Sequence, residues 1–195
     1  MKIAELCSAV CAMVVSQAVL AAQTTPTFDI LIKNGRVVDG TGSPWYNSDV
    51  GILNGKIAAI GKLNNSAKRT IDATHLIVAP GFIDMLGQSE FNILVDNRAA
   101  SKLLQGVTTE ITGEGGSIAP LSDRMIREGG VRNGKTPFDA FHVVADWRTL
   151  SDYFNRLEER VHPAINIGTF VGAGGIRDYV IGRDDRVATP AEMER

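Results

Sequence analysis

The chain has 195 residues, of which 44% are hydrophobic and 22% are charged, and its formal net charge is −2. This composition is typical of a globular protein with at least one sizeable domain, and it excludes disorder of the whole chain. A net charge so close to zero provides no field that would attract nucleic acid or an anionic membrane.

The first 22 residues differ in pattern from the rest. Lys2 precedes an apolar run at residues 9–15, and small residues follow at Ala21 and Ala22. This order is typical of a secretory signal peptide, so we predict cleavage after Ala21 or Ala22 and a periplasmic or secreted protein without membrane attachment. An uncleaved anchor is the alternative, although the apolar run is short for a membrane span.

Both cysteines, Cys7 and Cys11, lie inside this first segment. The mature chain predicted by cleavage therefore has no cysteine. This excludes a disulfide framework, a thiolate nucleophile and a cysteine zinc site after export.

Residues 23–79 have the pattern of short strands and turns. Asn34-Gly35 and Asn54-Gly55 each lie between short apolar stretches, which predicts two hairpins, and residues 76–79 predict a further strand. We therefore expect a small antiparallel β layer here, as part of a sandwich.

From residue 80 the pattern alternates between strands and helices. Strands are predicted in "GFIDML", in "VTTEIT" and in "INIGTFVGAGG". A helix closed by Gly106 has Ala99, Leu103 and Leu104 on one face, and "TLSDYFNRLEER" has an apolar face made of Leu150, Tyr153, Phe154 and Leu157. Thr189 and Pro190 predict the start of a last helix. Such an order is typical of βα units around a parallel sheet, and therefore of the α/β class.

Carboxylates are the best candidates for chemistry. His75, His142 and His162 lack the spacing of metal ligands, and no serine nucleophile motif is present. Four acidic residues lie at or near the ends of the first two parallel strands, where α/β barrels place their sites: Asp84, Glu90, Glu110 and Glu114. Glu114, set among glycines, is the best candidate for a metal ligand, and a solvated loop glutamate is the alternative. Asp84 could instead accept hydrogen bonds from loop amides.

Several motifs in the same order resemble those of the amidohydrolase superfamily. They are "DILIKNGRVVDGTGSP", "DVGILNGKIAAIGKL", "TIDATHLIVAPGFID", "QGVTTEITGEGGSIAP" and "NIGTFVGAGGIRDYVIG". The branch they most resemble is that of the N-acyl-D-amino-acid deacylases, or D-aminoacylases. The resemblance implies a (β/α)8 TIM-type barrel beside a small β-sandwich, and hydrolysis of a non-peptide C–N bond in an N-acyl amino acid by water that a zinc ion activates. We expect residues 80–195 to be the first part of such a barrel.

Three positions depart from the pattern of this family. Leu86-Gly87-Gln88 replaces His-x-His, and Gly172-Ala173-Gly174 replaces Gly-His-Gly. "TGEGGS" replaces a segment with a cysteine ligand, so Glu114 would take the place of that ligand. Gln88 and Glu90 are candidates for substrate binding. The resemblance also implies that Arg177 holds the substrate carboxylate, unless it pairs with Asp178 or Asp184.

About 115 residues follow Pro80, against roughly 250 in a full barrel. We therefore expect the later histidines and the aspartate that moves the proton to lie beyond Arg195, and the 195-residue chain to be inactive by itself. Two alternatives stay open. One is an exported binding protein that keeps the scaffold without catalysis, and the other is a small β module, residues 23–80, that folds alone.

Overall fold

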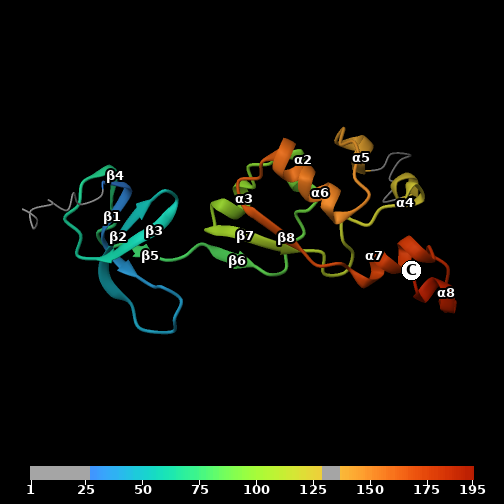
Figure 1. Cartoon of the computed structure of the whole chain (residues 1–195), viewed down its shortest axis with the longest axis horizontal. Coiled ribbons are helices and arrows are strands. Elements are labelled where there is room, and N and C mark those ends of the chain that lie inside the picture. Colours follow the sequence, from blue (N-terminus) through green and yellow to red (C-terminus); the bar gives the residue numbers. More distant parts are fainter. Residues whose placement is uncertain (1–26, 129–136) are drawn as a thin grey trace, which may run out of the picture. The chain divides into compact units, whose positions relative to one another are not determined.

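The computed structural model describes residues 27–128 and 137–195 (Figure 1). The predicted signal peptide lies outside these residues. The chain forms two compact units, one up to Pro80 and the other from Gly81 onward, and each is described by itself. None of the described helices has the length and apolar character needed to cross a membrane.

The first unit is a five-stranded mixed sheet. Its strands are β1 (Phe28–Val37), β2 (Tyr46–Leu53), β3 (Lys56–Gly61), β4 (Ala67–Asp72) and β5 (Ile77–Val78). The order is β3-β2-β1-β4, and β5 also pairs with β1. The β1–β2 and β2–β3 pairs are antiparallel, but β4 and β5 both run parallel to β1. The prediction of an antiparallel layer is therefore wrong in part, because hairpin signals report only neighbours in sequence.

The two Asn-Gly pairs adopt different structures. Asn54 and Gly55 have φ angles of +52° and +71° and connect β2 to β3, as predicted for a tight hairpin. Asn34-Gly35 instead lies inside β1, where the register with β2 shifts between Ile32 and Gly35. The hairpin predicted there is wrong. The pair forms a bulge, and the left-handed φ of +64° at Asn34 is one that asparagine tolerates well.

Close packing around β1 and β2 stabilises the first unit. Phe28, Leu31 and Val50 are almost fully buried. The ring of Phe28 lies over Gly51, where an added Cβ atom would come within 2.6 Å of it. Asp49 is also buried, and its two carboxylate oxygens accept hydrogen bonds from the backbone amides of Asn34 and Leu63 at 2.9 and 3.0 Å.

The second unit has three parallel strands in the order β6-β7-β8. The strands are β6 (Phe82–Asp84), β7 (Val107–Thr112) and β8 (Asn166–Thr169). The helices are α2 (Asn92–Val95), α3 (Ala100–Leu103), α4 (Asp123–Glu128), α5 (Pro137–Ala140), α6 (Leu150–Arg156), the π-helix η1 (Leu157–Val161), α7 (Ala173–Val180) and α8 (Pro190–Met193). The alternation confirms a mixed α/β fold. Three strands do not define a barrel, so the barrel stays a prediction.

Three local predictions for this unit need correction. The apolar sequence of "GFIDML" predicts a buried strand, yet Phe82 and Ile83 of β6 are 62% and 60% exposed. The helix before β7 is shorter than expected, because Ala99 has a left-handed φ of +45° and Leu104 is exposed. The strand predicted through Gly172-Ala173-Gly174 ends at Thr169, and Gly172 is the N-cap of α7.

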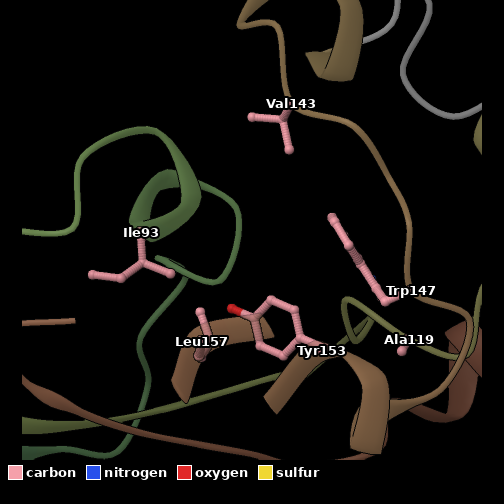
Figure 2. Packing of buried hydrophobic residues seen from close by; sticks show 6 residues of the cluster. All are labelled: Ile93, Ala119, Val143, Trp147, Tyr153 and Leu157. Carbon is pink, nitrogen blue, oxygen red and sulfur yellow. The ribbon is translucent and has the colours of Figure 1, made fainter. Parts of the chain in front are cut away.

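The core of the second unit is formed by the helices α2, α6 and η1 and by the loops around them. Its buried residues are Ile93, Ala119, Val143, Trp147, Tyr153 and Leu157 (Figure 2). Leu150 and Phe154 pack against them, as the amphipathic pattern predicted. A capping box between Thr149 and Asp152 begins α6. Figure 1 shows α2, α3 and α6 on the same side of the sheet.

Candidate active site

The adjacent parallel strands β6 and β7 bring two of the four predicted acidic residues, Asp84 and Glu110, together. Because the two strands are parallel and in register, Asp84 lies beside Glu110. The segments after the strands, residues 85–90 and 113–117, leave from the same edge of the sheet. This edge is where parallel sheets place their sites.

Three charged residues form a network at this edge. Lys102 of α3 contacts a carboxylate oxygen of Asp84 at 2.6 Å and Oε1 of Glu110 at 3.3 Å. The hydrogen bond from Lys102 lowers the pKa of Asp84 and raises the pKa of Lys102 in return. Asp84 also accepts a hydrogen bond from the amide of Leu86 at 3.1 Å, so the alternative of a bond to a loop amide is confirmed.

The sequence pattern does not indicate Lys102 as the partner of Glu110. Glu110 is fully buried, and a buried carboxylate is stable only with a partner of opposite charge or with hydrogen bonds. The one signal is a charged residue in the middle of a strand rich in β-branched residues, because a buried carboxylate of this kind requires a cation or hydrogen-bond donors nearby. Lys102 and Glu110 are eight residues apart and lie on different elements, so no helix or strand periodicity relates them.

Glu90 lies half-buried beside this network. Burial raises the pKa of the Glu90 carboxyl, and the negative charge of Glu110 raises it further. Its Oε2 is buried and has no hydrogen-bond partner among the described residues, and the same is true of Oε2 of Glu110. The hydroxyl of Tyr153 donates a 2.7 Å hydrogen bond to the backbone oxygen of Glu90, which ties this residue to the core.

Gln88 and Glu114 lie on the surface. Gln88 follows β6 and Glu114 follows β7, and both are exposed, as is Leu86. The part of the chain that the structure describes contains no group of three His, Cys, Asp or Glu side chains that could hold a metal ion. The described residues by themselves therefore do not fit a zinc site, and Glu114 as a metal ligand stays a prediction.

Arg177 of α7 contacts the chain that follows its own helix. Its Nη2 donates hydrogen bonds to the backbone oxygens of Asp184 and Arg186 at 2.9 and 2.8 Å. The carboxylate of Asp178 instead pairs with Arg124 at 2.6 Å. Arg177 therefore holds the loop before α8, and no contact in the structure tests its predicted role with a substrate.

The glycine-rich segments after β7 and β8 pack against each other. A Cβ atom on Gly172 would lie 2.7 Å from Cα of Gly116, and one on Gly113 would collide with the backbone oxygen of Phe170. The amide of Gly172 donates to Oγ of Ser117 at 3.2 Å. These glycines allow two backbones to approach each other closely.

Comparison with known proteins gives consistent matches. A family model described as the N-terminal domain of the urease alpha-subunit matches residues 10–84. The D-aminoacylase of Alcaligenes xylosoxydans xylosoxydans is 34% identical over 171 residues, which cover 85% of this chain and 33% of that protein. The N-acyl-D-glutamate deacylase of the same organism is 34% identical over 174 residues, which cover 86% and 33%.

Solved structures show the same relationship. A D-aminoacylase with a binuclear metal centre is 35% identical and has a TM-score of 0.69, over 86% of this chain and 34% of that one. An N-acyl-D-glutamate deacylase from Bordetella bronchiseptica, complexed with zinc and a phosphonate inhibitor, is 31% identical and has a TM-score of 0.68, over 87% and 34%. The chain thus spans about a third of the length of these relatives.

Proposed function

We propose that the chain is part of a hydrolase of non-peptide C–N bonds, and that it corresponds to the N-terminal portion of the D-aminoacylases, which it resembles. One observation carries this proposal. The similarity to D-aminoacylases extends over 85% of the chain at 34% identity, with a TM-score of 0.69 to a solved D-aminoacylase. Because the match is continuous in sequence and in fold, a chance likeness of single motifs does not explain it.

The proposed substrate is an N-acyl-D-amino acid or a related small amide. The names of the relatives support this class, since two of them are a D-aminoacylase and an N-acyl-D-glutamate deacylase. Gln88, Glu90 and Arg177 are the proposed substrate-binding residues of this chain. The exposed amide of Gln88 can donate to a carboxylate or an acyl oxygen, and the guanidinium of Arg177 can bind a carboxylate.

We propose that the complete enzyme holds a divalent metal, with Glu114 as one ligand. One solved relative contains zinc, and another is a D-aminoacylase variant in complex with copper. Bound at such a site, the metal would supply an activated water. Leu86 cannot ligate a metal, and the described residues offer no three-ligand group, so the other ligands and the main catalytic residues would lie outside this chain.

The proposed architecture is a TIM-type barrel whose first three strands are β6, β7 and β8. Their parallel order and the helices between them are those of successive βα units. Export to the periplasm or to the medium is also part of the proposal, and it rests on the pattern of residues 1–22 alone.

An activity assay tests the function directly. The 195-residue chain and a polypeptide that continues its reading frame would be incubated with N-acetyl-D-glutamate and N-acetyl-D-leucine, and with their L-enantiomers, and the release of free amino acid measured. We expect turnover of a D-substrate by the longer polypeptide, its loss with a chelator, and none by the 195-residue chain.

Two variants of the longer polypeptide locate the site. Glu114→Gln should abolish turnover and lower the zinc content, whereas the matched control Glu159→Gln, at an exposed position on η1, should change neither. Turnover by wild type that Glu114→Gln leaves unchanged would remove Glu114 from the proposed site. Absence of turnover on every amide tested would contradict the hydrolase itself.

A binding protein without catalysis is the second candidate. It is favoured by Leu86 at a strand end where the family pattern has a metal ligand, and by the absence of a metal-ligand group among the described residues. Calorimetry of the longer polypeptide distinguishes the two. Saturable binding of the N-acyl-D-amino acid without turnover, in the presence of zinc, would support this candidate and exclude the enzyme.

A further inference from the structure

Glu110 lies directly beside the segment that follows β6. Its Oε1 accepts a hydrogen bond from the amide of Ser89 at 3.2 Å. A Cβ atom on Gly87 would collide with Cγ and Oε1 of the same side chain. The buried Glu110 therefore contacts both Gly87 and Ser89, which are two positions apart in this segment.

The backbone of this segment is also attached to β7. The amide of Gly87 donates to the backbone oxygen of Ile111 at 2.9 Å. Gly87 is buried, whereas Leu86 and Gln88 on either side of it are exposed. The segment thus has one residue facing Glu110 and its two neighbours facing solvent.

The carboxylate of Glu110 is itself held in place by an ion pair. Lys102 contacts it at 3.3 Å and contacts Asp84 at 2.6 Å, and both partners come from elements packed against β7. Two negative charges and one positive charge, largely withdrawn from water, favour one fixed arrangement. A side chain fixed in this way can determine the path of the backbone it touches.

We propose that Glu110 is a positioning residue, which sets the backbone of residues 86–90 and so the orientation of Gln88 and Glu90. This inference rests on the proposed function only because it treats Gln88 and Glu90 as substrate-binding residues. The chemistry of Glu110 is acceptance of an amide hydrogen bond and steric exclusion of any side chain at position 87. It needs no contact with a substrate.

A double-mutant cycle on the 195-residue chain tests the steric part. Gly87→Ala should lower the urea midpoint of unfolding, whereas the control Gly115→Ala, with no atom within 4 Å of an added Cβ, should change it little. In a Glu110→Ala background, Gly87→Ala should lose most of its effect, because the colliding side chain is gone. In a Glu110→Gln background it should keep its full effect, because glutamine has the same shape.

A spectroscopic measurement tests the hydrogen bond, and it remains informative if Glu110→Ala does not fold. In Glu110→Gln, the amide proton of Ser89 should move upfield because a neutral acceptor replaces a charged one. Hydrogen exchange at residues 87–89 should accelerate about tenfold, while the amide of Tyr153 should be unaffected.

The outcomes separate this inference from the proposed function. Additive effects of Gly87→Ala and Glu110→Ala, or an unchanged Ser89 amide in Glu110→Gln, would overturn the positioning role even if deacylation is observed. A coupled cycle with a shifted Ser89 amide would support it even if no substrate is ever turned over.

Discussion

At the scale of single residues, Tyr153 connects the hydrophobic core to the candidate site. Its ring is fully buried and lies 5.8 and 5.7 Å from the rings of Trp147 and Phe154. Figure 2 shows it next to Leu157, with its hydroxyl directed away from Trp147. Burial, followed by the charges of Glu90 and Glu110, raises the pKa of Tyr153, so the hydroxyl stays a donor to Glu90.

Replacing this tyrosine tests the connection. Tyr153→Phe leaves the partly buried backbone oxygen of Glu90 without its donor, and should lower the free energy of unfolding by about 1–2 kcal/mol. Urea denaturation followed by circular dichroism measures the change. The matched control is Tyr179→Phe, since Tyr179 is 40% exposed. An equal loss in both variants would show that the hydroxyl bond contributes nothing.

Glu90 predicts a pH dependence of stability. Its pKa is raised in the folded state, so the folded chain holds the proton more strongly than the unfolded chain. The free energy of unfolding should therefore fall as the pH rises above 4.5, the ordinary value, through the raised pKa of Glu90. A carboxyl with a lowered pKa, such as Asp84, changes the free energy of unfolding only below about its ordinary pKa of 3.8, and so outside this pH window.

The variant Glu90→Gln, which cannot ionise, should lack this decline. Urea midpoints measured from pH 4 to pH 7 would give the two profiles, with Glu158→Gln at an exposed position as the control. Parallel profiles for wild type and Glu90→Gln would mean that the carboxyl of Glu90 titrates normally in the folded chain.

At the scale of elements, the first unit depends on how closely β2 packs against the side chains of β1. Gly51 of β2 lies under the ring of Phe28, which is 2% exposed. Because Phe28 is enclosed, its ring cannot move aside without disturbing its neighbours. Packing of this density tolerates neither an added methyl group nor a change of strand register.

Gly51→Ala should therefore destabilise the first unit by about 1–3 kcal/mol. Hydrogen exchange at the β1 and β2 amides, followed by mass spectrometry, measures the effect within this unit. Gly116→Ala serves as the control, because nothing lies within 4 Å of its added Cβ. Unchanged protection of β1 in Gly51→Ala would mean that the Phe28 ring has room to move.

At the scale of the whole molecule, the number of metal ligands that the chain itself provides decides whether zinc stabilises it. The carboxyl ends of β6 and β7 present exposed Gln88 and Glu114, with no three-ligand group among residues 27–128 and 137–195. One carboxylate alone binds zinc weakly, since zinc sites in proteins have three or four protein ligands.

Zinc should accordingly leave the thermal midpoint of the 195-residue chain unchanged. A longer polypeptide that supplies the other proposed ligands should be stabilised, by about 2.7 kcal/mol at a zinc concentration of 100 times Kd. Differential scanning fluorimetry with zinc and with a chelator measures both. A zinc-dependent rise in the 195-residue chain that Glu114→Gln removes would show that its own residues form the site.

The features that could be predicted from the sequence depend on neighbours in the chain. The Asn54-Gly55 hairpin, the apolar face of α6, and Thr189 and Pro190 at the start of α8 are all as predicted. The same is true of the strand β7 and of the acidic residues at the strand ends. These signals are local, because a turn, a helix cap or an amphipathic face involves residues a few positions apart.

The contacts between groups distant in the chain could not be predicted, because they form only when the strands and helices pack together. Asn34-Gly35 is a bulge because Asp49 accepts the amide hydrogen bond of Asn34, and β4 lies parallel to β1 across an intervening hairpin. Lys102 neutralises Glu110, and Glu110 in turn excludes a side chain at Gly87. Pairings of this kind depend on how strands and helices pack, so the local pattern that predicts each element does not contain them.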